Sequence, residues 1–374
     1  MIALAPLPET MPAAVLEGPG RLAVREIPIW PVERYGDPDL VLLEVEACGV
    51  CGSDYRYFAG ENPWAQHTLG RFVPNPPNIV LGHEYAGRVV AVASQANRHW
   101  LGKRVAAICS KVCGACVDCS AGREHLCAHT VHLGHGQGWG ERDFYSGAYA
   151  RYTLAWGSGS YELPEDVPYE EAAMLDILAV AVHIARVGNV GHGSRVLCIG
   201  AGPAGNAVAQ AARAMGAHEV WLTDPSEDAL AIAQTQGFAS PSSLPRMERA
   251  VAMRPGPGGG NSPRFDAVID TVGLSDTIEA GLDLLEKRGT FVNVAVHDAQ
   301  VTFNPSWIGA ERRFTTSCNF ERSDFEQAAA WLADGNFQVS EWLTPIALSD
   351  LPHLFGQTAS EGKRAFKLVV TRFE

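Results

Sequence analysis

The stretch RVLCIGAGPAGNAVAQAARAMGAHEVWLTD, residues 195–224, decides the fold of this chain. Its apolar run 196–199 is typical of a strand buried on both faces of a parallel sheet. A glycine-rich turn and a helical pattern of small residues follow, and a second apolar run ends at Asp224. This order of strand, turn, helix and strand predicts a βαβ unit of a doubly wound parallel sheet.

Each glycine of the turn Gly200-Ala201-Gly202-Pro203-Ala204-Gly205 has a steric role. Gly200 allows the tight turn, Gly202 lets a pyrophosphate approach the backbone, and Gly205 lets the helix pack against the strand. The helix that begins at Pro203 and Ala204 offers its N–H groups and its dipole to phosphates. A glycine-rich turn without a ligand is the alternative, but the flanking strand and helix favour a dinucleotide site.

Asp224 indicates which dinucleotide binds. A carboxylate at the end of the second strand accepts hydrogen bonds from the ribose hydroxyls and repels a 2′-phosphate. Residues 225–228 contain no arginine or lysine that would receive such a phosphate. The sequence therefore predicts NAD rather than NADP.

Composition limits the class of protein. The chain has 374 residues, 47% hydrophobic and 19% charged, which predicts a globular protein of two domains. Its net charge of −13 argues against nucleic acid or an anionic membrane as partner. The first residues lack the basic region of a signal peptide, so we expect a cytoplasmic protein. The nine cysteines are an odd number, and we expect them to be thiols and metal ligands rather than disulfides.

Four cysteines are the strongest single signal. Cys113, Cys116, Cys119 and Cys127 follow the spacing C-x2-C-x2-C-x7-C in a polar, turn-rich segment. Four thiolates on one short lobe suit the tetrahedral sulfur site of a structural zinc. An iron–sulfur site and free thiols are the alternatives, and we rank zinc first because no partner cluster motif follows.

Residues 12–110 read as many short strands, with a proline-rich loop at 61–78 that we expect to be a surface flap. His132 and His135 lie in a glycine-rich stretch; metal ligation is one possible role, but we expect them to be solvent-exposed. Residues 169–187 read as one helix that contains Asp176, a candidate metal ligand beside an apolar face. After residue 323 we expect one helix, 325–333, and a final strand, 366–371.

Together these features resemble the zinc-dependent medium-chain alcohol and polyol dehydrogenases over nearly the whole chain. The resemblance rests on Cys-Gly-Ser-Asp at Cys51, Gly-His-Glu at Gly82, the four-cysteine lobe and the glycine-rich turn, in that order. It implies an α/β protein in which a GroES-like, β-rich catalytic domain (1–177 and 320–374) is interrupted by a Rossmann NAD-binding domain (178–319).

The resemblance also implies roles for single residues. Cys51 and His83 would hold a catalytic zinc, Glu84 would be a direct ligand or a close outer carboxylate, and Asp176 falls at the position of a further ligand. Ser53 would begin a proton relay, and Asp54 would orient His83. Near the cofactor it implies three further residues: Lys367 at the phosphates and ribose, with Val180 and Val296 against the nicotinamide.

The implied enzyme oxidises a secondary alcohol, a polyol, cyclitol or sugar derivative, with NAD and two zinc ions per subunit, as a homo-oligomer (dimer or tetramer). A short-chain alcohol or threonine-type substrate is one alternative, and a non-catalytic zinc- and NAD-binding protein is another. The chain departs from the pattern at Arg56, where many members have a histidine that ends the relay. Arginine has donors only and cannot accept that proton.

Overall fold

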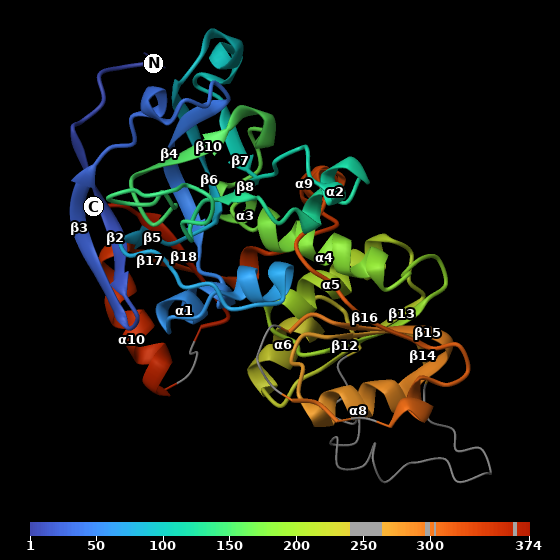
Figure 1. The fold of residues 1–374 in the computed structure, drawn as a ribbon. Coiled ribbons are helices and arrows are strands. Elements are labelled where there is room, and N and C mark those ends of the chain that lie inside the picture. Colours follow the sequence, from blue (N-terminus) through green and yellow to red (C-terminus); the bar gives the residue numbers. More distant parts are fainter. Residues whose placement is uncertain (240–263, 296–299, 303, 362–364) are drawn as a thin grey trace. The chain divides into compact units, whose positions relative to one another are not determined.

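A computed structural model describes residues 1–239, 264–295, 300–302, 304–361 and 365–374 (Figure 1). The chain divides into two compact units. The first comprises Met1–Asp176, Glu321–Ala333 and Trp342–Glu374, and the second comprises Ile177–Phe320 and Asp334–Glu341. Within the part of the chain described, no helix is long and apolar enough to cross a membrane.

The first unit is built on an eight-stranded sheet with the order β11-β7-β6-β4-β18-β17, to which β1 adds on β6 and β10 on β4. Its strands are β1 (Ile2–Ala3), β4 (Leu40–Gly49), β6 (Glu84–Val92), β7 (Arg104–Ala107), β10 (Tyr152–Trp156), β11 (Ser160–Glu162), β17 (Leu343–Ala347) and β18 (Lys367–Arg372). A smaller sheet orders β3 (Arg21–Pro28), β2 (Thr10–Gly18) and β5 (Ile79–Val80) as β3-β2-β5. The antiparallel pair β4 and β6 lies at the centre and brings Gly49 opposite Glu84.

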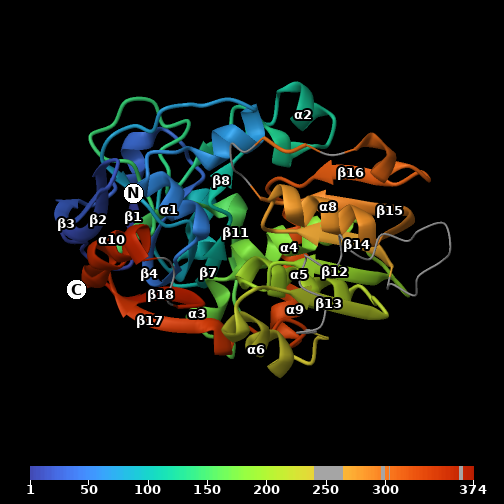
Figure 2. The same ribbon diagram turned by 90° about the horizontal axis from the view of Figure 1, so that it is seen from below.

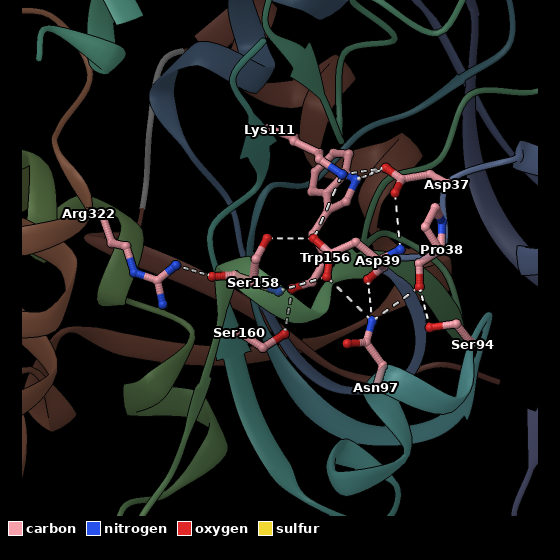
Figure 3. Close-up of polar contacts among 10 residues, drawn as sticks. All are labelled: Asp37, Pro38, Asp39, Ser94, Asn97, Lys111, Trp156, Ser158, Ser160 and Arg322. Atoms are coloured by element: carbon pink, nitrogen blue, oxygen red, sulfur yellow. Dashed lines mark hydrogen bonds and ion pairs between the residues drawn. The ribbon is translucent and has the colours of Figure 1, made fainter. Parts of the chain in front are cut away.

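Polar contacts anchor the start of β4 (Figure 3). The Asp37 carboxylate accepts hydrogen bonds from Lys111 Nζ at 2.7 Å and Trp156 Nε1 at 3.1 Å. Asn97 Nδ2 donates to the Asp39 carbonyl at 2.7 Å, and Arg322 of α9 (Arg322–Ala333) donates to the Ser158 carbonyl. Lys111 lies on β8 (Ser110–Lys111), so this network fixes the strand that leads into the four-cysteine lobe.

The second unit is a parallel sheet with the order β13-β12-β14-β15-β16, as the alternating sequence pattern predicts. Its strands are β12 (Arg195–Ile199), β13 (Glu219–Thr223), β14 (Phe265–Asp270), β15 (Leu285–Asn293) and β16 (Arg313–Thr316). The helices α5 (Pro203–Ala214) and α8 (Ser275–Leu284) cover opposite faces of this sheet, as Figures 1 and 2 show, and α6 (Glu227–Thr235) packs on β13.

Two predicted elements differ from the structure. The helix predicted over 169–187 is divided into α3 (Tyr169–Ala172) and α4 (Leu175–Val187). The break lies at Met174, whose buried side chain packs so closely against Gly49 that a Cβ there would lie 2.6 Å from Met174 Cε. This tertiary contact leaves no trace in the local periodicity.

The prediction of one helix after residue 323 is also wrong, because α10 (Leu351–Glu361) follows α9. Pro352 is tolerated at the start of α10, where its missing N–H has no partner within a helix. Leu351 and Phe355, one turn apart, are fully buried against the first unit's core.

Candidate active site and metal centres

Cys51, His83 and Glu84 come together at the ends of the two central strands. Their ligand atoms all lie within 4.8 Å of one another. Cys51 follows β4 and is the N-cap of α1 (Gly52–Phe58), whereas His83 and Glu84 stand at the start of β6. Gly49 is needed for this approach, since a Cβ there would lie 2.2 Å from Glu84 Oε2.

His83 is held from both sides of its ring. Asp54 Oδ1 lies 3.4 Å from His83 Nδ1, and Ser53 Oγ lies 3.3 Å from His83 Nε2. The other oxygen of Asp54 accepts hydrogen bonds from the Cys51 N–H at 2.9 Å and from the Tyr149 hydroxyl at 2.7 Å. Tyr149 has no motif around it in the sequence, so its contact with Asp54 could not be predicted.

Charge balance at this centre favours a cation. Burial opposes protonation of His83, but the carboxylate of Asp54 and the Cys51 thiol raise the pKa of His83 well above its usual value. Asp54 and Glu84 are both fully buried. A buried site with two carboxylates, a thiol and an imidazole supplies the sulfur, nitrogen and oxygen ligands that zinc prefers.

Glu84 forms a buried ion pair with Lys367, the first residue of β18. Lys367 Nζ lies 2.8 Å from Glu84 Oε1 and 2.5 Å from Oε2. Burial opposes the charge on Lys367, and the neighbouring Glu84 carboxylate nevertheless raises the pKa of the ammonium group. The family resemblance implies a role for Lys367 at the cofactor, which stays a prediction. Its contact with Glu84 joins residues 283 positions apart that no motif connects.

Asp176 lies in the first turn of α4, outside the group of three ligands. Cys109 Sγ donates a hydrogen bond to Asp176 Oδ1 at 3.6 Å. Burial first, and then the charge of Glu84, raise the pKa of Asp176 to about 6. Asp176 is therefore near enough to feel the centre electrostatically while its hydrogen bond goes to a second cysteine.

The prediction that His132 and His135 are solvent-exposed is wrong. Their exposed fractions are 6% and 7%, because their rings pack into a cluster with Tyr57 and Trp64. The predicted surface flap 61–78 contributes to this burial: its first part, with Trp64, is buried, and exposure begins at Gly70. The glycine-rich sequence around the two histidines suggested a loop and gave no sign of this packing.

The four cysteines of the lobe are arranged for one tetrahedral metal. The Sγ–Sγ distances are 4.0 Å for Cys113–Cys119, 3.5 Å for Cys116–Cys119, 3.9 Å for Cys116–Cys127 and 3.6 Å for Cys113–Cys127. A tetrahedral zinc with Zn–S bonds of about 2.3 Å requires sulfurs about 3.8 Å apart. Backbone N–H groups of Ala115 and Cys116 lower the pKa of Cys113 to about 6, so this sulfur is ready to bind as a thiolate. The lobe fits a structural zinc.

The glycine-rich turn has the predicted shape. Gly200 has a φ of +96°, and a Cβ on Gly205 would lie 1.8 Å from the Gly200 carbonyl oxygen, so helix and strand could not pack with any larger residue. Gly202 is the N-cap of α5, with Pro203 and Ala204 in its first turn. Asp224, directly after β13, accepts a hydrogen bond from the Ala201 N–H at 2.8 Å through Oδ2.

Two other predicted cofactor residues remain as predictions. Val180 lies on α4, half-buried. Val296 lies outside the residues that the structure describes.

Comparisons with known proteins agree with both units. Residues 37–165 match the family described as alcohol dehydrogenase GroES-like domain, and residues 203–334 match zinc-binding dehydrogenase. The chain is 30% identical over 325 residues to a probable D-xylulose reductase A of Aspergillus clavatus, covering 84% of this chain and 85% of that one.

Two solved structures share the fold along both chains. A zinc-binding dehydrogenase from Sinorhizobium meliloti 1021, described as putative and bound to NADP, has a TM-score of 0.81 at 28% identity and covers 97% of this chain and 99% of its own. Acetophenone reductase from Geotrichum candidum with NAD has a TM-score of 0.80 at 26% identity, covering 99% of each chain. The chain therefore belongs to the zinc-dependent medium-chain alcohol and polyol dehydrogenases, and it is an oxidoreductase that uses a nicotinamide cofactor.

Proposed function

We propose that this enzyme oxidises a secondary hydroxyl of a polyol, cyclitol or sugar derivative with NAD, and reduces the matching ketone in reverse. The observation that carries the proposal is the group Cys51, His83 and Glu84, whose ligand atoms lie within 4.8 Å of one another beside Ser53. The similarity to a probable D-xylulose reductase supports a polyhydroxylated substrate. The first unit would be the catalytic domain and the second the NAD-binding domain.

In the proposed reaction the residues of the first unit hold and orient the groups. A bound zinc would polarise the substrate hydroxyl while the nicotinamide accepts the hydride. Cys51, His83 and Glu84 would hold this ion, Asp54 would fix the tautomer and orientation of His83, and Lys367 would balance the charge of Glu84. Cys113, Cys116, Cys119 and Cys127 would hold a second, structural zinc.

Ser53 would take the proton of the substrate hydroxyl. Its Oγ already lies at hydrogen-bond distance from His83. Arg56, one turn further along α1, donates hydrogen bonds to Glu61 and Gln66 and has no lone pair to accept the proton. Water or the cofactor ribose would therefore complete the path to solvent.

Asp224 supports NAD as the cofactor. Its Oδ1 accepts the Ser226 N–H at 2.8 Å and its Oδ2 the Ala201 N–H at 2.8 Å, which fixes the carboxylate beside the glycine-rich turn. A fixed negative charge there accepts ribose hydroxyls and repels a 2′-phosphate. The two solved relatives carry NADP and NAD respectively, so the family alone does not decide the cofactor.

A cytoplasmic location and a homo-oligomeric state, dimer or tetramer, belong to the same proposal. None of the nine cysteines forms a disulfide, which suits a reducing compartment. Light scattering of the purified enzyme would test the oligomeric state, and a monomer would refute it.

The test is a screen of NAD reduction with acyclic polyols, cyclitols, simple secondary alcohols and threonine. We expect the highest kcat/KM for a polyol or cyclitol, and loss of activity in Cys51→Ser. Cys318→Ser, a cysteine outside both metal groups, is the matched control and should stay active. Activity confined to simple alcohols or threonine would refute the proposed substrate class, while full activity in Cys51→Ser would refute the site.

A further inference from the structure

Four aromatic rings pack against one another next to His83. His135 stacks on Tyr57 with centroids 4.9 Å apart, His132 lies 4.5 Å from His135, and Trp64 lies 5.1 Å from His132. We call Tyr57, Trp64, His132 and His135 the ring cluster. The His135 ring meets the His83 ring edge-on at 5.9 Å, so the cluster borders the proposed zinc centre.

The ring cluster contains four buried nitrogens without a hydrogen-bond partner among the described residues: Nδ1 and Nε2 of His132, Nδ1 of His135 and Nε1 of Trp64. The three side chains are 6–7% exposed. Buried polar atoms are nearly always hydrogen-bonded, because leaving one unpaired costs the full free energy of its desolvation. Four such atoms on touching rings therefore indicate a polar ligand that binds among them.

The chemistry of the cluster favours a neutral hydroxylated ligand. Both histidines are buried, which disfavours a charged ring, and a neutral imidazole offers one donor and one acceptor. A hydroxyl group donates and accepts in the same way, whereas a phosphate or carboxylate requires cationic partners. The neighbouring cations are already engaged, Arg56 by Glu61 and Lys367 by Glu84.

We propose that His132 and His135, together with Trp64 Nε1, bind a second hydroxyl of the substrate beside the one that is oxidised. The substrate is then a neutral polyol with neighbouring hydroxyl groups rather than a simple alcohol, a sugar phosphate or an acid. This inference rests on the proposed function and specifies its substrate class.

The test compares His132→Phe, which keeps the packed ring, with His132→Asn, which restores a donor and an acceptor. For each enzyme, kcat and KM are measured with a polyol active on the wild type and with a secondary alcohol that has one hydroxyl. His129→Phe is the matched control, because His129 is exposed in the same segment. Melting temperature and zinc content establish that each variant is folded and contains its zinc. If His132→Phe fails either check, His135→Phe replaces it.

We expect His132→Phe to lower the ratio of kcat/KM for the polyol to that for the mono-alcohol roughly ten- to hundredfold, mainly through KM. His132→Asn should recover part of this loss, and His129→Phe should keep the wild-type ratio. Calorimetry should show the same loss of polyol affinity in the complex with NADH. A ratio within threefold of the wild type in His132→Phe overturns the inference alone, whereas a wild type inactive on every alcohol overturns the proposed function as well.

Discussion

Asp224→Ser combined with Pro225→Arg should move the cofactor preference from NAD towards NADP. Both oxygens of Asp224 accept backbone N–H groups at 2.8 Å, from Ala201 and from Ser226. The carboxylate therefore cannot turn away from a phosphate bound at the end of β13. Pro225 follows directly and offers a place for a cation.

The size of the effect follows from Coulomb's law. Two like charges about 5 Å apart repel by about 3 kcal/mol at an effective dielectric constant of about 20, and by about half of this at 40. Asp224 is half-buried, which places it between these values. We therefore expect the unmodified enzyme to prefer NAD by roughly 10- to 150-fold in kcat/KM, and the double variant to lose most of this preference.

The assay is kcat/KM for NAD and for NADP with one alcohol at saturation. Asp228→Ser is the control, because Asp228 is an exposed acid on the following helix, α6. It should leave the ratio unchanged. An unmodified enzyme that uses both cofactors within fivefold would refute the reading of Asp224.

Cys116→Ser should lower Tm by roughly 5 °C or more and release one zinc per chain. Cys318→Ser is the control and should do neither, and a Cys116→Ser variant as stable as the wild type would contradict a structural zinc. Asp176→Asn should keep the fold and the cysteine-lobe zinc but reduce the occupancy of the zinc site at Cys51, His83 and Glu84, or kcat, roughly tenfold, with the exposed Asp166→Asn as control. An unaltered enzyme would leave Asp176 as a helix carboxylate without a metal role. Burial lowers the pKa of His132 to about 3, so the folded protein holds this ring neutral while the unfolded chain protonates it below about pH 6.5. The free energy of unfolding is therefore undiminished above pH 6.5 and falls as the pH drops towards 3. His132→Phe removes this loss, so its unfolding free energy relative to the wild type should be about 2 kcal/mol more favourable at pH 5 than at pH 7. Denaturant unfolding at both pH values measures it, and an equal loss of stability between pH 7 and pH 5 in the variant and the wild type would contradict this.

Much of the fold could be predicted because its signals are local. The turn at Gly200 and Gly205 needs residues without a Cβ, and a strand and a helix must flank it. The cysteine spacing likewise brings four sulfurs together within a short lobe. In both cases the residues that carry the chemistry are neighbours in the sequence.

The rest depends on contacts between distant residues. The ion pair of Glu84 with Lys367 forms only when β4, β6 and β18 pair. The Tyr149 hydroxyl reaches Asp54 from the segment that precedes β10, 95 residues further along the chain. The burial of His132 requires Trp64 from a loop that reads as an exposed flap. Polar or aromatic residues in glycine- and proline-rich segments look exposed until their partners are known.

Zinc stoichiometry measured together with activity tests the central claim most directly. The purified enzyme should contain two zinc ions per chain, and a mild chelator should remove one of them. Activity should then be lost while Tm changes little, and added zinc should restore activity, because the four-cysteine site retains its metal and the site of Cys51, His83 and Glu84 does not. Full activity after the zinc at Cys51, His83 and Glu84 has been removed, or a fully active enzyme with only one zinc per chain, would contradict this assignment.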